Sequence, residues 1–348
     1  MFPPNRREAS TTLRLSAGSE ADLSRAAEIL QAGGTVALPT ETVYGLGAKA
    51  LDPAAVAKIF AAKARPNWDP LIVHIADRAM LDRIAAIPPD LQSRIDALIA
   101  AFWPGPLTLL LPRTAAVPDA VTAGRALVGV RMPAHPVALA LLRRAGVPVA
   151  APSANRFGRT SPTTAAHVLD DLDGRIDAVL DGGPTHVGVE STVLDPTQSP
   201  LVIYRPGAVT AAMIAEATGC DVTLFRPRAA NVEAAPESLP SPGVGLRHYA
   251  PRARLVLVEG PGGLAAALGG LKNGRVGIML PDGWAVPDGA EVFAWGPWDE
   301  QDRLAQRLFA GLRTLDAAGV DVILCPVPAG EGVAAALRDR LEKAARPV

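Results

Sequence analysis

The chain has 348 residues, of which 49% are hydrophobic, and its 34 lysines and arginines nearly balance 35 aspartates and glutamates, for a formal net charge of −1. This composition excludes a disordered chain and is typical of a globular protein long enough for two domains. The near-zero charge gives no global field that would attract nucleic acid or an anionic membrane, so any basic site must be local.

Cysteine usage and the N-terminal segment favour a cytoplasmic location. Cys220 and Cys325 have neither the spacing of a metal site nor that of a redox pair, and so few cysteines indicate a reducing compartment. The first sixteen residues lack an apolar segment of signal-peptide length. No run approaches the ~18 apolar residues of a membrane span. We therefore expect a cytoplasmic protein that does not bind a membrane.

The beginning of the chain alternates helix and strand signals. A capping-box-like start predicts a helix over residues 19–32, and Thr35–Leu38 predicts a strand that Pro39 ends. A polar, turn-prone loop containing Gly45 and Gly47 is expected to follow. Because α/β proteins place ligands where strands end in such loops, this stretch is a candidate binding loop.

Two short motifs predict helix starts. Asp52-Pro53 supplies an N-cap and a proline at the first helical position, and Lys63 continues the apolar face of that helix. A lysine in this place either snorkels to solvent or points into a cleft. Ser161-Pro162 repeats the signature, and a serine-capped helix N-terminus is also a ready anion site.

Further elements complete an α/β pattern over residues 1–220. Helices are expected over about 91–102, before Gly146 and from about Thr210. The expected strands are Leu71–Ile75, Leu107–Leu111, Leu127–Met132, Val147–Ala151, Ala178–Leu180, Ser191–Leu194 and Leu201–Tyr204.

A linker and a second domain follow. Within residues 221–254 the composition shifts to Pro, Ala, Gly and Arg without a hydrophobic period, and a connection of this length is either functional or disordered. Residues 255–348 then predict a smaller doubly wound domain, in which Glu259–Gly263 is expected to be a plain turn. Its expected strands are Leu255–Val258, Val276–Leu280, Glu291–Trp295 and Val322–Leu324, and its expected helices are Leu264–Leu268, Leu304–Leu315 and a terminal helix from about Val333.

Polar and cationic groups gather where the strands of the first domain end. Positive charge beside serine-containing turns suits a polyphosphate together with a carboxylate. Each residue alone could be a cap or an ion-pair partner, but the whole set favours a ligand site. The residues at the strand ends are Thr40, Thr42, Arg131, Ser153, Asn155 and Arg205, and a helix end and a strand between them add Lys63, Arg65 and His74.

Several common catalytic frameworks are absent from the sequence. There is no GxxxxGK[ST] phosphate loop, no GxGxxG turn, no HExxH motif, no GxSxG elbow and no Cys/His cluster. Nucleotide binding would therefore use another framework, and no side-chain cluster predicts a metal site.

Eight segments in order between Leu23 and Gly207 resemble the YrdC family. They are PTETVYGLG (39–47), KARP (63–66), PLIVHI (70–75), WPGPLT (103–108), VRMP (130–133), APSAN (151–155), ESTV (190–193) and YRPG (204–207). The linker motif SPG (241–243) with RHYAP (247–251) and the second domain are similar to the long, two-domain form of the family. The resemblance implies a YrdC-like twisted mixed sheet with helices, plus a smaller C-terminal Rossmann-like α/β domain.

The resemblance also implies a reaction. L-threonine, bicarbonate and ATP would be joined into threonylcarbamoyl-AMP and pyrophosphate, with Mg²⁺ assisting. The adenylate would pass to the tRNA threonylcarbamoyl transferase machinery, and direct binding of tRNA is left open.

By the same analogy, one set of residues would bind threonine and another set would bind ATP. Threonine would contact Thr42, His74, Arg131, Ala151 and Ser191. ATP would contact Lys63, Arg65, Asp69, Leu127, Ser153, Asn155, Ser161 and Arg205, and His248 and Tyr249 of the linker would close over it. Leu127 and Asp69 depart from the family pattern, which has threonine and asparagine there. Leu127 could therefore contribute only backbone, and Asp69, beside a triphosphate, would need a Mg²⁺ ion or a cation.

The residue chemistry fits this reaction independently. Threonine-N-carboxylate formed from bicarbonate is already an anionic nucleophile, so no activated serine or cysteine is required. Fixed cations and Mg²⁺ must neutralise the phosphates. We expect Lys63, Arg65 and Arg205 to fill that role, Lys63 and Arg65 being the catalytic pair, and Arg131 to bind the threonine carboxylate.

Two other functions compete with this interpretation. A carbamoyltransferase could make a carbamoyl-adenylate on the same fold, but it would need a further segment that supplies carbamoyl phosphate. A non-enzymatic RNA-binding module is disfavoured by the near-neutral charge and by aromatics at only 4%. The second domain could be a structural partner, although we rank gating by the linker first.

Overall fold

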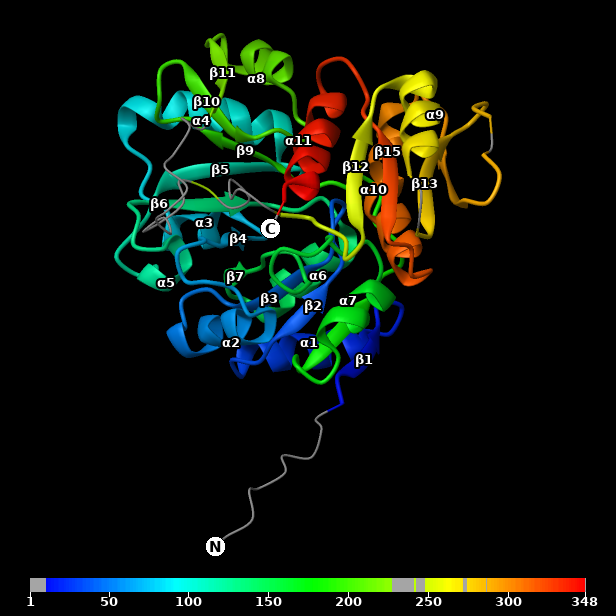
Figure 1. Ribbon diagram of the computed structural model, residues 1–348. Coiled ribbons are helices and arrows are strands. Elements are labelled where there is room, and N and C mark those ends of the chain that lie inside the picture. Colours follow the sequence, from blue (N-terminus) through cyan, green and yellow to red (C-terminus); the bar gives the residue numbers. More distant parts are fainter. Residues whose placement is uncertain (1–10, 227–240, 242–247, 272–273, 286, 348) are drawn as a thin grey trace, which may run out of the picture.

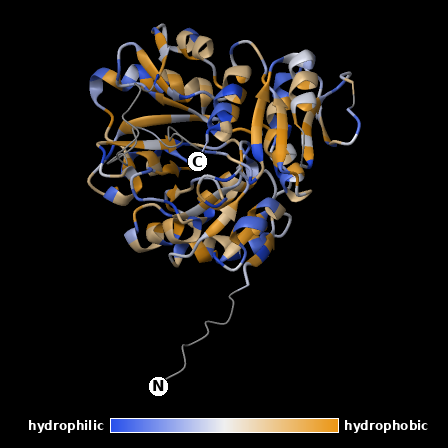
Figure 2. Cartoon of the chain, in the orientation of Figure 1, coloured by the Kyte–Doolittle hydropathy of each residue, from blue (hydrophilic) through white to orange (hydrophobic). Residues whose placement is uncertain are grey.

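The structure is a computed structural model that describes residues 11–226, 241, 248–271, 274–285 and 287–347. Within these residues the chain forms an 11-stranded mixed sheet and a smaller, four-stranded parallel sheet, both flanked by helices (Figure 1). The strands of both sheets are largely apolar, as Figure 2 shows in orange. The predicted α/β fold class, with a mixed sheet and a smaller Rossmann-like domain, is confirmed.

The first sheet has the order β1-β8-β2-β3-β7-β4-β6-β5-β9-β10-β11. Its strands are β1 (Leu13–Ser16), β2 (Val36–Leu38), β3 (Gly45–Lys49), β4 (Ile72–His74), β5 (Leu107–Pro112), β6 (Leu127–Arg131), β7 (Val149–Ala150), β8 (Ala178–Asp181), β9 (Thr192–Asp195), β10 (Leu201–Arg205) and β11 (Val222–Leu224). The helices around it are α1 (Glu20–Gln31), α2 (Pro53–Lys63), α3 (Arg78–Ile84), α4 (Pro89–Phe102), α5 (Asp119–Thr122), α6 (Pro136–Ala145), α7 (Ala165–Leu172) and α8 (Ala211–Thr218).

The pairing of β4 with β6 brings two predicted site residues together. The two strands are parallel and in a register that sets His74 beside Arg131. β7 pairs antiparallel with β4 on its other side, so the segment after β7 returns across the same part of the sheet. Residues from distant parts of the sequence therefore converge on β4.

The second sheet has the order β12-β15-β13-β14, with all of its pairs parallel. Its elements are β12 (Arg254–Val258), α9 (Gly260–Gly270), β13 (Val276–Pro281), β14 (Glu291–Gly296), α10 (Gln301–Ala317), β15 (Val322–Pro326) and α11 (Val333–Ala345). One apolar cluster joins the sheet to α9, and a separate cluster joins it to α10 and α11. Helices therefore cover both faces, as expected for a doubly wound domain.

The two domains share part of one hydrophobic core. The cluster beneath α10 and α11 includes Val43 and Val189 from the first domain and Tyr249 from the linker. Tyr249 is 1% exposed and stacks on Phe309 of α10 with ring centroids 5.8 Å apart. Burial of this shared apolar surface holds the second domain against the first.

Several local predictions are wrong. The expected loop around Gly45 and Gly47 is strand β3, paired with β2 and β7. Ser161-Pro162 does not begin a helix, because α7 begins at Ala165 and the Thr164 side chain caps it. The expected turn at Glu259–Gly263 is instead the first turn of α9. β11 also extends the first sheet into the residues expected to form the linker.

Gly47 allows β2, β3 and β7 to approach one another. A methyl group there would lie 2.9 Å from the Leu38 side chain, 2.9 Å from that of Val149 and 3.1 Å from the Val36 carbonyl oxygen. We expect Gly47→Ala to destabilise the fold by about 1–3 kcal/mol, because overpacking must push the strands apart. The midpoint of urea unfolding measures this effect.

Gly262→Ala is the matched control for that experiment. Its added methyl group meets no atom within 4 Å, and it lies in helix α9, where alanine is favoured over glycine. We expect its unfolding midpoint to be unchanged or higher. Equal midpoints for the two variants would contradict the packing described for β3.

Candidate active site

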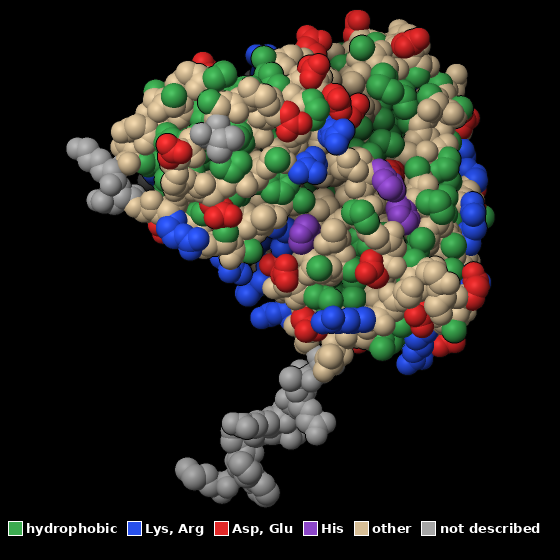
Figure 3. Space-filling model, turned by 90° about the vertical axis from the view of Figure 1, so that its right-hand side faces the viewer, with side chains coloured by type: hydrophobic (Ala, Val, Ile, Leu, Met, Phe, Trp, Pro, Cys, Tyr) green, Lys and Arg blue, Asp and Glu red, His purple; other side chains and the backbone are tan. Residues whose placement is uncertain are grey.

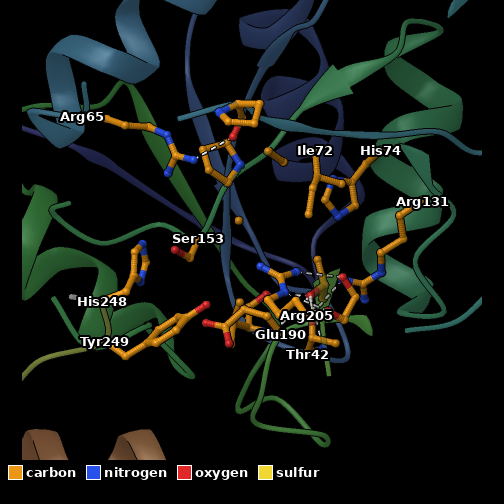
Figure 4. A pocket seen from close by; sticks show the side chains of 17 residues that line it. Thr42, Arg65, Ile72, His74, Arg131, Ser153, Glu190, Arg205, His248 and Tyr249 are labelled. Carbon is orange, nitrogen blue, oxygen red and sulfur yellow. Dashed lines mark hydrogen bonds between the residues drawn. The ribbon is translucent and has the colours of Figure 1, made fainter. Parts of the chain in front are cut away.

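A cavity that is partly open to solvent lies between the first sheet, the segment after β7 and the end of the linker (Figure 4). It gathers residues predicted for threonine and residues predicted for ATP. Ile72 and His74 occupy alternate positions of β4, so their side chains leave the same face of the sheet. The lining residues are Thr40, Thr42, Val43, Gly45, Arg65, Pro70, Ile72, His74, Arg131, Ala151, Pro152, Ser153, Glu190, Ser191, Arg205, His248 and Tyr249.

Arg131, at the end of β6, is held by contacts on three sides. Its Nη2 lies 2.6 Å from Oε1 of Glu41, its Nη1 donates to Oγ1 of Thr42 at 2.9 Å, and its Nε donates to the Gly105 carbonyl at 3.1 Å. The side chain is only 4% exposed. A buried guanidinium fixed in this way is a preorganised fork for a carboxylate.

His74 is buried beside Arg131 without an internal partner. Neither of its ring nitrogens has a hydrogen-bond partner among the described residues. Burial, together with the positive charge of Arg131, lowers the pKa of His74 to about 3. The ring is therefore neutral near pH 7 and offers one donor and one acceptor to a ligand in the cavity.

Arg205 and Ser191 form another part of the cavity lining. Arg205 Nε donates to the Ser191 carbonyl at 3.0 Å and its Nη2 donates to Ser191 Oγ at 3.1 Å. Ser191 Oγ also lies 2.8 Å from Oγ1 of Thr108 on β5. These bonds set both the serine hydroxyl and the guanidinium at the lining of the cavity.

Arg65 and Asp69 form a buried ion pair at the end of α2. Arg65 Nη2 lies 3.0 Å from Oδ2 of Asp69, and the guanidinium also donates to the carbonyls of Asp69 at 3.1 Å and Pro70 at 2.7 Å. Burial raises the pKa of Asp69, while Arg65 opposes that shift. Of the two partners expected for Asp69, a Mg²⁺ ion or a cation, the structure supplies a cation, Arg65.

Lys63 lies behind the cavity and supports its wall. Its side chain is 1% exposed, and its Nζ donates to the carbonyls of Ser153, at 2.6 Å, and Asn155. Burial and the neighbouring charge of Arg65 hold the pKa of Lys63 well below its ordinary value. Asn155 in turn donates to the carbonyls of Arg156 and Arg159, both at 2.8 Å, so the turn after Ser153 is fixed from within.

The structure thus separates the predicted site residues into two groups. Thr42, Arg65, His74, Arg131, Ala151, Ser153, Ser191, Arg205, His248 and Tyr249 line the cavity, whereas Lys63, Asp69, Leu127, Asn155 and Ser161 do not. Ser161 donates instead to a carboxylate oxygen of Glu190. Leu127 begins β6 opposite Pro112, four residues before Arg131.

The end of the linker closes one side of the cavity. His248 and Tyr249 have ring centroids 4.2 Å apart, and the His248 ring meets Phe157 edge-on at 5.7 Å. Tyr249 has a φ of 64°, an uncommon backbone conformation for a residue other than glycine. Burial holds the pKa of His248 well below its ordinary value, and the positive charges of Arg65 and Lys63 add to that shift.

Sequence reasoning assigned no role to Glu41 or Glu190. Glu41 lies inside the motif at residues 39–47, and its presence before Thr42 was the only local signal. Glu190 lines the cavity and is 6% exposed. Its ion-pair partner, Arg340, comes from α11, 150 residues further along the chain. No local pattern could have joined them.

The described residues contain neither a metal-ligating cluster nor a membrane-spanning helix. They contain no group of three or more His, Cys, Asp or Glu side chains that could hold a metal ion. Among the same residues, no helix combines the length and apolar character that a membrane crossing requires.

The low pKa of His74 can be tested directly. We predict that its ring stays neutral between about pH 5 and 8, so its Cε1–H chemical shift should not titrate there, with His74→Gln used for assignment. The folded-state pKa of about 3 lies below the ordinary 6.5, so the unfolded chain binds this proton first. His74 therefore lowers stability as pH falls from 6.5 towards 3. A midpoint near pH 6.5 in the titration of the His74 Cε1–H chemical shift would contradict the buried, unpaired ring.

Comparison with known proteins identifies related chains. A family model of Sua5, YciO and YrdC proteins, described as "Telomere recombination", matches residues 28–207. A second model, described as the C-terminal domain of threonylcarbamoyl-AMP synthase, matches residues 209–346.

Similar proteins cover almost the whole chain. The threonylcarbamoyl-AMP synthases of Pyrococcus abyssi (strain GE5 / Orsay) and Bacillus subtilis (strain 168) are each 42% identical to it, over 92% and 94% of both chains respectively. The crystal structure of P. abyssi Sua5 complexed with L-threonine has a TM-score of 0.85 at 40% identity, covering 96% of this chain and 97% of that one. The predicted resemblance is confirmed, and the chain belongs to the threonylcarbamoyl-AMP synthase family in its two-domain Sua5 form.

Proposed function

We propose that this protein joins L-threonine, bicarbonate and ATP into threonylcarbamoyl-AMP and pyrophosphate, for the threonylcarbamoyladenosine modification of tRNA. One observation carries the proposal: a single cavity, in a chain 42% identical to two synthases, is lined by Arg131 and His74 on one side and by Arg65 and Arg205 on others. A relative of 40% identity was crystallised with L-threonine.

The threonine end of the site is centred on Arg131. Its guanidinium binds the threonine carboxylate while Glu41 and Thr42 keep it in place. Ser191 and the neutral His74 ring supply further hydrogen-bond partners, and Ala151 adds apolar contact for the threonine methyl group. Because His74 stays uncharged, it does not compete with Arg131 for the carboxylate.

The triphosphate end is formed by Arg65, Arg205 and Ser153, which face the same cavity. Lys63 contributes by holding the carbonyls of Ser153 and Asn155, so we assign it to the shape of the phosphate-binding turn. Mg²⁺ enters with the triphosphate as part of the substrate, since it prefers phosphate oxygens and water to an all-protein cage. Without an acidic cluster among the described residues, the phosphates themselves would supply its ligands.

The proposed chemistry proceeds by two bond-forming steps. The threonine amine and bicarbonate form an N-carboxylate with loss of water. One oxygen of that carboxylate then attacks the α-phosphorus, while the bond to the bridging oxygen breaks and pyrophosphate leaves. The protein's part is to align the groups and to neutralise charge on the leaving phosphates, which requires no covalent intermediate on the chain.

The wider setting follows from this product. An adenylate that carries the threonylcarbamoyl group must be consumed by a transferase acting on tRNA, so we place the protein upstream of that machinery in the cytoplasm. Cys220 and Cys325 are both free thiols, which agrees with a reducing compartment. The face in Figure 3 carries acidic and basic side chains together, which gives no support to an RNA-binding module.

The activity is tested by release of pyrophosphate from ATP, with identification of the adenylate by mass. We expect release to require both threonine and bicarbonate, and carbamoyl phosphate not to replace them. Pyrophosphate release that ignores threonine, or an adenylate with the mass of carbamoyl-AMP, would contradict the proposal.

Arg131→Lys should raise the KM for threonine about tenfold or more, because a lysine keeps the charge but loses the planar fork that meets a carboxylate. The KM for ATP should change much less. Arg78→Lys, at a surface ion pair with side chains 49% and 63% exposed, is the matched control and should behave as the unaltered protein. A larger change for ATP than for threonine would place Arg131 at the wrong end of the site.

The linker is proposed to close the cavity over ATP. Replacing His248 and Tyr249 together by alanine should lower pyrophosphate release at least tenfold, because one wall of the cavity is lost. Phe225→Ala removes another aromatic side chain, which packs on Tyr204 with centroids 4.8 Å apart and lies outside the cavity, and serves as the control. Unchanged activity in the double variant would show that these side chains are passive.

A further inference from the structure

Helix α11 of the second domain sets one arginine against the cavity of the first domain. In Figure 1 this helix stands between the two sheets. Arg340 is 1% exposed, and its Nε lies 2.7 Å from Oε2 of Glu190, which lines the cavity. Its guanidinium also lies over the Tyr249 ring, 5.2 Å from the centroid. One side chain thus contacts the first domain, the linker and, through Asp339 at 2.6 Å, its own helix.

The position of Glu190 creates an electrostatic problem that Arg340 solves. An unpaired carboxylate in the lining would repel the triphosphate and would compete with it for Arg205, which faces the same cavity. Apart from Arg340, this carboxylate accepts a hydrogen bond from the uncharged hydroxyl of Ser161. The guanidinium of Arg340 also donates to the Glu190 carbonyl at 3.3 Å, so it orients the backbone of this segment as well.

We propose that Arg340 is a positioning residue of the synthase site: it neutralises Glu190, holds Tyr249 in the cavity wall and so leaves Arg205 available to the phosphates. The inference rests on the proposed function in taking ATP as the ligand. By this inference the second domain contributes one buried cation to the active site, and it is not assigned a ligand of its own. Arg340 acts through Glu190 and Tyr249.

The same helix provides a matched control. Arg338 is two residues away and donates to the carbonyls of Pro328, at 2.9 Å, and Gly330, both inside the second domain. Arg338→Met therefore removes the same chemical group from α11 without touching Glu190 or Tyr249. Its ATP affinity should match that of the unaltered protein.

The test compares Arg340→Met, Arg338→Met and the double variant Arg340→Met with Glu190→Gln in the full-length protein. Calorimetric binding of a non-hydrolysable ATP analogue is measured first, and KM values for ATP and threonine afterwards. Arg340→Met should weaken analogue binding and raise the KM for ATP about tenfold or more, with a smaller effect on threonine. The double variant should recover to within about threefold of the unaltered protein, because the uncompensated charge is gone.

The double variant separates an electrostatic role from a merely structural one. Three results would each overturn the inference. Arg340→Met could bind the analogue with normal affinity, the double variant could bind it as weakly as the single variant, or neither variant could fold. Failure of the single variant to fold, with a folded and binding double variant, would support it. If the unaltered protein binds the analogue but makes no adenylate, the proposed reaction is wrong. The comparison of the Arg340 variants in analogue binding then still tests the role of Arg340. Absence of analogue binding to the unaltered protein overturns both.

Discussion

The architecture depends on burying cations around one cavity and giving each of them a fixed internal partner. Arg65, Arg131, Arg205 and Arg340 are 9%, 3%, 5% and 1% exposed. A buried charge is tolerated only when it is paired and hydrogen-bonded, and each of these guanidinium groups contacts a backbone carbonyl, a carboxylate or both. The donors are therefore ordered before any substrate arrives, which is what electrostatic catalysis of phosphoryl chemistry requires.

This requirement explains why the two domains belong to one site. The first domain supplies Glu190 and Arg205, the linker supplies Tyr249, and the second domain supplies Arg340 and the ring of Phe309 on which Tyr249 stacks. Apolar packing carries the docking, since Val43 and Val189 share a cluster with α10 and α11. The ion pair then sets the charge of the cavity wall. The contacts that hold the domains together and the ion pair at the cavity wall thus lie close to one another.

Much of the fold and of the site was predictable from sequence, and the exceptions have physical causes. Strand ends in parallel register bring His74 and Arg131 together, so their proximity followed from the α/β pattern. β3 was missed because its glycines suggest a turn, whereas Gly47 is there to let three strands approach. Ser161-Pro162 looked like a helix start, but its hydroxyl serves Glu190 instead. The roles of Glu190 and Arg340 depend on a contact across 150 residues, which no local pattern encodes.

We propose that a cavity without a glycine-lysine phosphate loop holds a triphosphate against an amino acid. A crystal structure with a non-hydrolysable ATP analogue and L-threonine tests it most directly. We expect the threonine carboxylate on the Arg131 guanidinium and the phosphates between Arg65, Ser153 and Arg205. Ligand bound elsewhere, with these side chains unoccupied, would contradict it.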